Sequence, residues 1–198
     1  MKLLVDDGTV RTRYLMRDEI VKLVSTAEEN RQTRQFGFSS LHFTAWPEWI
    51  MLNANTGLRN REMLFLEFTD VDWNAAVLHI RRKPHLKFHP KSHQERRIPI
   101  NEPAMSALQS LLAKKHSNSE FMFHQTDGSR WKNVRMSFAN LVKQCGLKSV
   151  TLHTMRHTFG AQLLPNRECS RRTARRLKGR GHHGTAGAPR GHAASRAP

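Results

Sequence analysis

The sequence is poor in several residue types, and each scarcity excludes a class of protein. Its two cysteines, Cys145 and Cys169, are too few for a disulfide framework and are typical of a reducing compartment. No apolar run approaches the roughly 18 residues of a membrane-spanning helix. The amino-terminal MKLLVDD has too short an apolar run for a signal peptide. There is a single tyrosine, Tyr14. These features predict a cytoplasmic protein without a membrane segment.

Acidic residues are also scarce relative to basic ones. The chain has 33 Lys and Arg against 16 Asp and Glu, a net charge of +17. Such an excess favours a polyanionic partner, because cations that neutralise nucleic-acid phosphates release condensed counterions. Charge alone leaves two alternatives open: a nonspecific basic protein of the ribosomal or chromatin type, and adhesion to an anionic membrane.

The end of the chain differs in composition from the rest. Residues 165–198 carry eight Arg, one Lys and one Glu, and Leu177 is their only sizeable aliphatic residue. Such a segment cannot bury enough apolar surface to offset its ordering entropy. We therefore expect a flexible amino terminus over residues 1–10, a folded domain over residues 11–164 and a disordered tail over residues 165–198. Histidines and Cys169 in the tail fit no standard zinc spacing, so no metal or other cofactor is expected.

Within residues 11–164 the apolar spacing is mostly helical, and one stretch alternates as a strand does. The alternating stretch, 77–80, and its expected partner, 96–100, form a hairpin with a long basic tip. The fold class predicted is α+β, mainly helical with a small antiparallel sheet. Leu112, Cys145, Phe159 and Leu163 are expected to face the core. The helices are predicted over residues 18–28, 46–55, a short stretch from 59, from 101 onward, 131–145 and 151–164, with residues 30–40 as a loop.

Two basic positions in the first part of the domain lie where local structure fixes them. In NANTGLRNREML, Arg59 falls in the first turn of a helix, and Glu62 one turn later can orient its guanidinium. The ordinary alternative is a surface Arg–Glu pair. In KFHPKSHQERRIPI, Lys91 lies at the hairpin tip, with Lys87 as a second candidate. The alternative there is a solvated basic loop that contacts phosphates without taking part in chemistry.

A third position is the motif HTMR near the end of the domain. His153 and Arg156 are three residues apart on a predicted helix, so they share a face. By itself a His-x-x-Arg pair is most simply a surface pair.

Together, the order and spacing of these motifs resemble a known family. TG-L-R-x-x-E, then P-K-S before R-R-x-P-I, then H-x-x-R-H-T-F are similar to the catalytic domain of tyrosine recombinases, the phage integrase family. RTRYLMRDEIVKLV at the start of the domain and TDVDW after the first motif also match. The resemblance covers about residues 11–164.

The resemblance implies a role for each position. Arg59 and Arg156 match the two arginines that clamp the non-bridging oxygens of a scissile DNA phosphate, for which a planar guanidinium is suited. Lys91 matches the lysine that protonates the leaving 5′ oxygen, and His153 the general acid/base. Glu62 matches a supporting acidic residue. Further candidates for DNA phosphate contacts are Arg96, Arg97 and Lys87. The family reaction forms a 3′-phosphotyrosyl intermediate and needs no cofactor.

One part of the family pattern is missing. After H-x-x-R-H-T-F the family continues with a helix, a Leu-Gly-His and then the nucleophilic tyrosine. Here Gly181-His182 is a loose match, which makes His182 a possible second histidine, and no tyrosine follows it. Tyr14 lies far upstream, where the family does not keep its nucleophile. No nucleophile is therefore assigned.

Two hypotheses account for the altered tail. Its Arg, Gly, Ala and Pro content fits an out-of-frame translation of a GC-rich gene, and it also fits an Arg-rich arm that grips DNA. The function expected is a site-specific DNA recombinase or integrase, here in a truncated form with impaired or no catalysis. The alternative is a non-enzymatic DNA-binding protein or regulator. The partner expected is double-stranded DNA, with a homo-oligomer on DNA (a tetramer in the family) and neither a membrane nor a small-molecule substrate.

Overall fold

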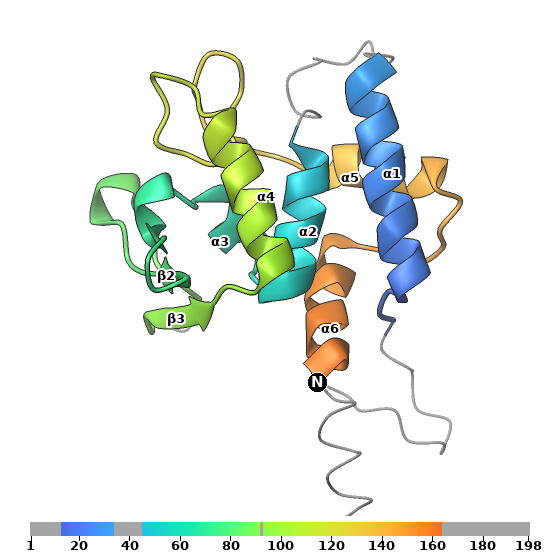
Figure 1. Ribbon diagram of the computed structural model, residues 1–198, viewed down its shortest axis with the longest axis horizontal. Helices are drawn as coiled ribbons and strands as arrows, with labels where there is room; N and C mark the ends of the chain where they lie inside the picture. The colour runs from blue at the N-terminus through green and yellow to red at the C-terminus, as the bar shows by residue number, and fades with distance from the viewer. Residues whose placement is uncertain (1–12, 34–44, 92, 164–198) are drawn as a thin grey trace, which may run out of the picture. The chain divides into compact units, whose positions relative to one another are not determined.

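The computed structural model of the protein describes residues 13–33, 45–91 and 93–163 (Figure 1). In these ranges the chain forms helices and one three-stranded antiparallel sheet, so the predicted fold class is confirmed. The predicted flexible amino terminus, most of the predicted loop at 30–40, and the predicted tail with Cys169 and His182 lie outside the described residues. No helix in the described part of the chain is long and apolar enough to cross a membrane.

The helices are α1 (Arg17–Thr33), α2 (Trp46–Thr56), α3 (Asn60–Leu64), α4 (Glu102–Ala113), α5 (Arg135–Gln144) and α6 (Leu152–Leu163). The strands are β1 (Val71–Asp72), β2 (Val77–Ile80) and β3 (Arg96–Pro99), in the order β1-β2-β3. Two short 3-10 helices, η1 (Phe68–Asp70) and η2 (Pro84–Leu86), flank the sheet.

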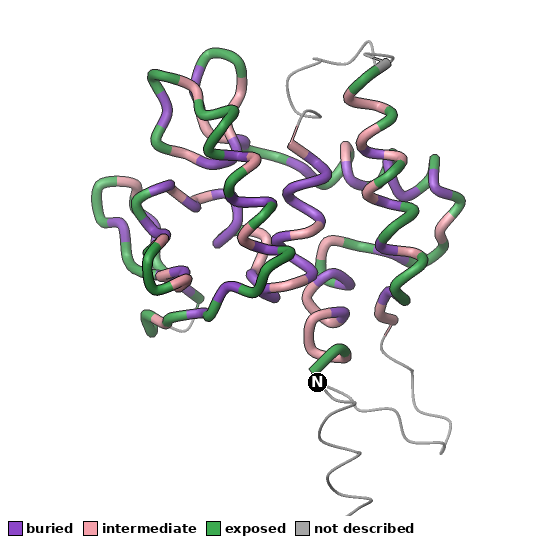
Figure 2. Tube along the Cα trace, in the orientation of Figure 1, coloured by how far each residue is buried: buried purple, intermediate pink, exposed green. Residues whose placement is uncertain are grey.

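The core is built around α2, which packs against both α1 and α4. Nine of its eleven residues are buried, and Figure 2 shows this concentration of buried residues along the helix. Trp46 and Trp49 pack edge to face with ring centroids 5.2 Å apart, and Trp131 and Phe138 each lie 5.6 Å from Trp46. Aromatic pairs at such distances add to the free energy gained from burying their area.

The sheet forms as its alternation predicts. Leu78 pairs with Ile98 across β2 and β3, both pointing inward, while His79 pairs with Arg97 on the other face. The two-residue strand β1 pairs with β2 through Val71 and Leu78. This third strand was not predicted, because two residues are too few to show a period.

Several predicted boundaries and burials are wrong. The helix predicted from residue 131 begins at Arg135. Trp131 and Val134 are buried all the same, from the segment that precedes the helix, and their spacing matches the helical period by coincidence. Leu112 and Leu163 expose 43% and 56% of their surface instead of facing the core. Helix α1 continues to Thr33, five residues past the predicted end at Glu28.

A buried carboxylate joins three of the helices. Glu48 on α2 is 5% exposed. Its Oε1 accepts hydrogen bonds from Arg31 on α1 (3.0 Å), from Ser110 on α4 and from Lys114, the C-cap of α4. Burial by itself would raise the pKa of the Glu48 carboxyl. The hydrogen bonds from Lys114 and Ser110 outweigh burial and hold that pKa below its ordinary value of 4.5.

We predict that Glu48→Gln lowers the free energy of unfolding by about 2 kcal/mol at pH 7, the size of a hydrogen bond to a charged group. Since the folded-state pKa is lowered, the contribution is present above pH 4.5 and is lost as the pH falls through the folded-state value. Urea unfolding at pH 7 and at pH 3.5 measures this. The exposed Glu102→Gln is the control, and an equal loss in the two variants would contradict the assignment.

Candidate functional site

The turn between α2 and α3 positions the first candidate residue. Gly57 ends α2 in a left-handed conformation, with φ +60°. The chain then turns so that Arg59 is the N-cap of α3, just before its first turn rather than inside it. Glu62 accepts a hydrogen bond from the Arg59 backbone N–H (2.8 Å) and another from its Nη1 (3.2 Å). The predicted pairing of Arg59 with Glu62 is confirmed.

Helix α6 brings the motif HTMR against this turn. Thr151 and Thr154 cap the start of the helix reciprocally: each backbone N–H donates to the other's Oγ1. The Arg156 Nη1 donates to the backbone carbonyl of Gly57. Phe159 packs so closely on Gly57 that a Cβ atom at Gly57 would lie 2.3 Å from its ring. The packing of α6 onto the Gly57 turn therefore brings Arg156 close enough to Arg59 for their charges to interact.

Glu62 is shared between two arginines from different elements. Besides Arg59, it pairs with both terminal nitrogens of Arg96 on β3, at 2.9 and 2.6 Å. Glu62 is 3% exposed. Burial by itself would raise the pKa of the Glu62 carboxyl, but hydrogen bonds from Arg96 and from the Arg59 backbone N–H hold it below 4.5. Burial and then the positive charge of Arg59 lower the pKa of Arg156. One buried anion thus lies among three guanidinium groups.

Lys91 reaches the site from the loop between β2 and β3. This loop is anchored at its base by Lys83, which is buried. The Lys83 Nζ donates to the backbone carbonyl of Phe65 (2.7 Å) and pairs with Glu67 (3.0 Å) and Asp70. The anchor fixes the start of the loop against the end of α3, on the same helix that Arg59 caps.

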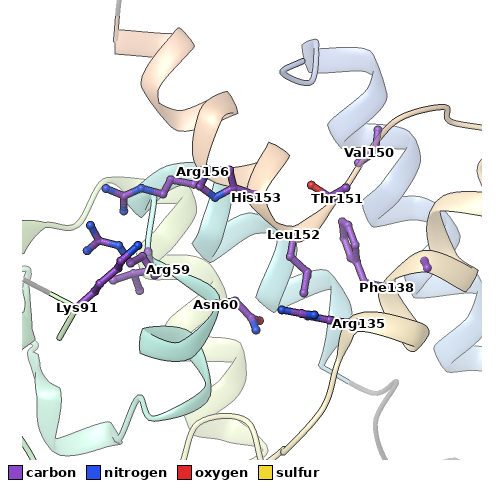
Figure 3. Close-up of a pocket in the computed structure, with 12 residues that line it drawn as sticks. Arg59, Asn60, Lys91, Arg135, Phe138, Val150, Thr151, Leu152, His153 and Arg156 are labelled. Atoms are coloured by element: carbon purple, nitrogen blue, oxygen red, sulfur yellow. The ribbon is translucent and has the colours of Figure 1, made fainter. Parts of the chain in front are cut away.

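Arg59, Lys91, His153 and Arg156 line one pocket of about 570 Å³. Figure 3 shows the nitrogen-bearing ends of Arg59, Lys91 and Arg156 at one end of it, with His153 beside Arg156. Asn60 and Arg135 follow along one side of the pocket, and the apolar side chains of Leu152, Phe138 and Val150 lie away from the cationic end (Figure 3). The lining contains no Asp or Glu. The complete lining is Leu58, Arg59, Asn60, Lys91, Arg135, Phe138, Ala139, Val150, Thr151, Leu152, His153 and Arg156.

The structure thus brings together four of the predicted site residues and sets others apart. Lys87 and Arg97 are exposed and do not line the pocket. Arg96 lies behind the pocket, on Glu62, and Glu62 itself is not part of the lining. Of the two lysines considered for the hairpin, the pocket contains Lys91.

Sequence reasoning missed Arg135 and the environment of His153. Arg135 begins α5, a position that the wrongly placed helix start concealed. The ring of His157 lies edge-on to that of His153, with centroids 4.4 Å apart. Burial and then the charge of His153 lower the pKa of His157. The spacing of four residues on one helix could have revealed this second contact.

The arrangement is suited to an oxyanion. Three guanidinium groups and an ammonium group line the pocket, and a guanidinium offers paired donors that match two oxygens of one phosphate. His153 lies in the first turn of α6, where the helix dipole favours negative charge. The described residues hold no cluster of His, Cys, Asp or Glu that could bind a metal ion.

Curated proteins similar to this chain include two tyrosine recombinases named XerA. The one from Pyrococcus furiosus is 27% identical over 58% of this chain and 39% of its own length. The one from Pyrococcus horikoshii is 26% identical over 77% of this chain and 47% of its own length. The chain therefore spans less than half the length of these relatives.

Solved structures show the same fold. The Tn1549 transposon integrase in complex with transposon right end DNA has a TM-score of 0.65, covering 82% of this chain and 56% of that chain at 22% identity. The crystal structure of XerA recombinase has a TM-score of 0.59, covering 77% of this chain and 51% of that chain at 23% identity.

The family model described as the phage integrase family matches residues 13–182. The match runs past residue 164, where composition places the domain boundary, and ends at His182; that boundary stays a prediction. The three motifs that contain Arg59, Lys91, His153 and Arg156 lie inside the match, and the neighbouring structures share the fold. By this match over most of its length, the chain belongs to the phage integrase family.

Proposed function

We propose that this chain is the DNA-binding and phosphate-activating domain of a site-specific tyrosine recombinase. The observation that carries the proposal is the pocket in which Arg59, Lys91, His153 and Arg156 gather without any acidic residue in the lining. Family membership and the integrase solved in complex with transposon DNA support double-stranded DNA as the partner. We propose that it acts on DNA in the cytoplasm, as a homo-oligomer.

The proposed chemistry assigns each side chain one task. Arg59 and Arg156 hold the two non-bridging oxygens of a phosphodiester. In the family reaction they stabilise the charge that grows on these oxygens when a tyrosine hydroxyl bonds to the phosphorus and the bond to the 5′ oxygen breaks. Lys91 donates a proton to the departing 5′ oxygen, and His153 serves as the general acid/base. Glu62 and Arg96 are positioning residues, because their contacts are to Arg59 and to each other.

The pocket lining contains no tyrosine that could attack the phosphorus. Its single tyrosine, Tyr14, precedes α1 and is absent from the pocket lining. The neighbouring Leu15 N–H donates to Thr158 on α6 (2.9 Å), which ties this segment to a helix of the site. We propose that the chain binds DNA and forms little or no covalent adduct. This favours, as the second candidate function, a non-enzymatic DNA-binding protein that occupies recombination sites.

DNA binding is tested by measuring the affinity for a duplex between 50 and 200 mM salt. The double variant Arg59→Ala/Arg156→Ala is expected to make the slope of log affinity against log salt shallower by about 1, because the two arginines hold one phosphate and each neutralised phosphate contributes about 0.9. Removal of two tail arginines, Arg171→Ala/Arg172→Ala, is the control. Equal effects of the two double variants would favour a nonspecific basic protein.

The chemistry is tested with a nicked suicide duplex that traps covalent protein–DNA adducts. The outcome expected is salt-sensitive binding with no adduct. An adduct that Tyr14→Phe abolishes would make Tyr14 the nucleophile and favour the enzyme. An adduct that persists in Tyr14→Phe would contradict the proposed chemistry.

A further inference from the structure

Next to the pocket, two arginines lie on a pair of stacked phenylalanine rings. Phe65, at the end of α3, and Phe88, in the loop between β2 and β3, have ring centroids 4.6 Å apart and planes 15° apart. The guanidinium carbon of Arg130 lies 3.9 Å from the centre of the Phe65 ring. That of Arg61 lies 5.7 Å from Phe65 and 5.9 Å from Phe88. We call Arg61, Phe65, Phe88 and Arg130 the Arg61–Arg130 cluster.

The cluster carries two positive charges and no negative one. In the described part of the chain, neither guanidinium has a carboxylate within ion-pair distance. The hydrogen bond found for Arg130 runs from its Nη1 to the carbonyl of Trp131 (2.9 Å). Burial and then the charge of Arg61 lower the pKa of Arg130, and no acidic group opposes them. By contrast, Arg59, Arg81 and Arg96 all pair with a buried carboxylate.

The cluster shares two elements with the pocket. Arg61 follows the N-cap Arg59 by two residues on α3, and Phe88 precedes Lys91 by three in the same loop. Figure 1 shows α3 beside this hairpin, and the stacked rings join them. Arg59 lines the pocket and Arg61 does not, so we assign the two arginines to different groups of the DNA. A backbone strand of duplex DNA offers the next phosphate within about 3.4 Å along the helix axis.

We propose that Arg61 and Arg130 together bind a second backbone phosphate of the DNA duplex whose first phosphate occupies the pocket. The inference rests on the proposed function. Two guanidinium groups on the same pair of rings, without a counter-ion among the described residues, leave most of their donors open to one shared oxyanion. Their stacking on the rings restricts both side chains before DNA arrives, so less rotamer entropy is lost on binding. This second contact would fix the direction in which the duplex crosses the pocket.

The alternative is that the arginines only cover apolar ring surface. Two double variants separate the readings: Arg61→Gln/Arg130→Gln removes both charges, and Arg61→Lys/Arg130→Lys keeps them while losing the planar stack. We expect the Gln pair to make the salt slope of duplex binding shallower by about 1, the contribution of one neutralised phosphate, and the Lys pair to keep the wild-type slope. If only packing matters, neither pair changes the slope, and the Lys pair still lowers the melting temperature.

The matched control is Lys22→Gln/Lys143→Gln, which removes the same charge from exposed positions on α1 and α5. It is expected to leave the slope at the wild-type value. If the Gln pair unfolds, Arg61→Gln alone is used, because Arg61 is exposed and its loss uncovers little surface. The slope is then expected to be shallower than that of the wild type by less than about 1, because Arg130 still contacts the shared phosphate. A wild-type protein without salt-sensitive binding overturns the proposed function. A wild-type protein that binds, with the Gln pair matching the Lys22/Lys143 control, overturns this inference alone.

Discussion

Gly57→Ala is expected to lower the free energy of unfolding by about 3 kcal/mol. The left-handed φ of +60° costs a residue with a side chain on the order of 1 kcal/mol. The rest comes from the new Cβ, which would lie 2.3 Å from the Phe159 ring and must push α6 away. For a chain of this size, the loss corresponds to a fall in melting temperature of about 6–12 °C. Because Arg156 moves with α6, the affinity for duplex DNA should fall too.

The sequence offers a matched control for this variant. Gly146 has nearly the same backbone angle, φ +64°, with no atom within 4 Å of the place where a Cβ would stand. Gly146→Ala therefore carries the backbone cost alone, and the difference between the two variants measures the contact with Phe159. Adding Phe159→Leu to Gly57→Ala should recover part of the loss. Equal melting temperatures for the two alanine variants would show that α6 accommodates the extra carbon without strain.

The second large effect is expected for Glu62→Gln, which leaves Arg59, Arg96 and Arg156 close together without their shared anion. We expect the free energy of unfolding to fall by about 3 kcal/mol at pH 7. This is the low end for breaking a buried ion pair, because the guanidinium groups keep some access to water. Urea unfolding measures the loss, and far-ultraviolet circular dichroism checks that the variant is folded.

A double-mutant cycle decides whether charge is the cause. If Glu62 stabilises the fold by neutralising Arg96, then Glu62→Gln/Arg96→Gln loses less than the sum of the two single variants, by about 1–2 kcal/mol. The exposed Arg97→Gln, next to Arg96 on β3, serves as the control and should not couple to Glu62. Strict additivity of Glu62 and Arg96 would mean that the two side chains act independently, against the contacts at 2.9 and 2.6 Å.

Features set by local chemistry were predictable from the sequence. The alternation of β2, the end of α2 at Gly57 and the pairing of Arg59 with Glu62 all depend on residues at most four positions apart. The order and spacing of the motifs predict that Arg59, Lys91, His153 and Arg156 form one site, and all four line the pocket. The family match and the shared fold confirm the predicted resemblance.

Features set by distant partners were not predictable. Arg96 lies in a basic segment of the kind that contacts DNA phosphates, and the sequence predicts that role for it. In the structure its guanidinium pairs with the carboxylate of Glu62, 34 positions earlier in the chain. Lys83 is a lysine in a basic loop, and only the fold reveals that Glu67 and Asp70 hold it in the interior. Trp131 obeys a helical period while lying outside the helix, because burial alone does not specify backbone conformation.

The contact of α6 with the Gly57 turn also has a consequence for gene shuffling between members of the family. Arg156 donates to the carbonyl of Gly57, 99 positions earlier, and Phe159 packs where a side chain at Gly57 would stand, 102 positions earlier. The two stretches of sequence must therefore be compatible with each other. In a library of chimeras between this chain and a relative, folded DNA-binding members should be those that take residues 53–59 and 152–159 from the same parent. Crossovers between those two stretches should be tolerated only in pairs.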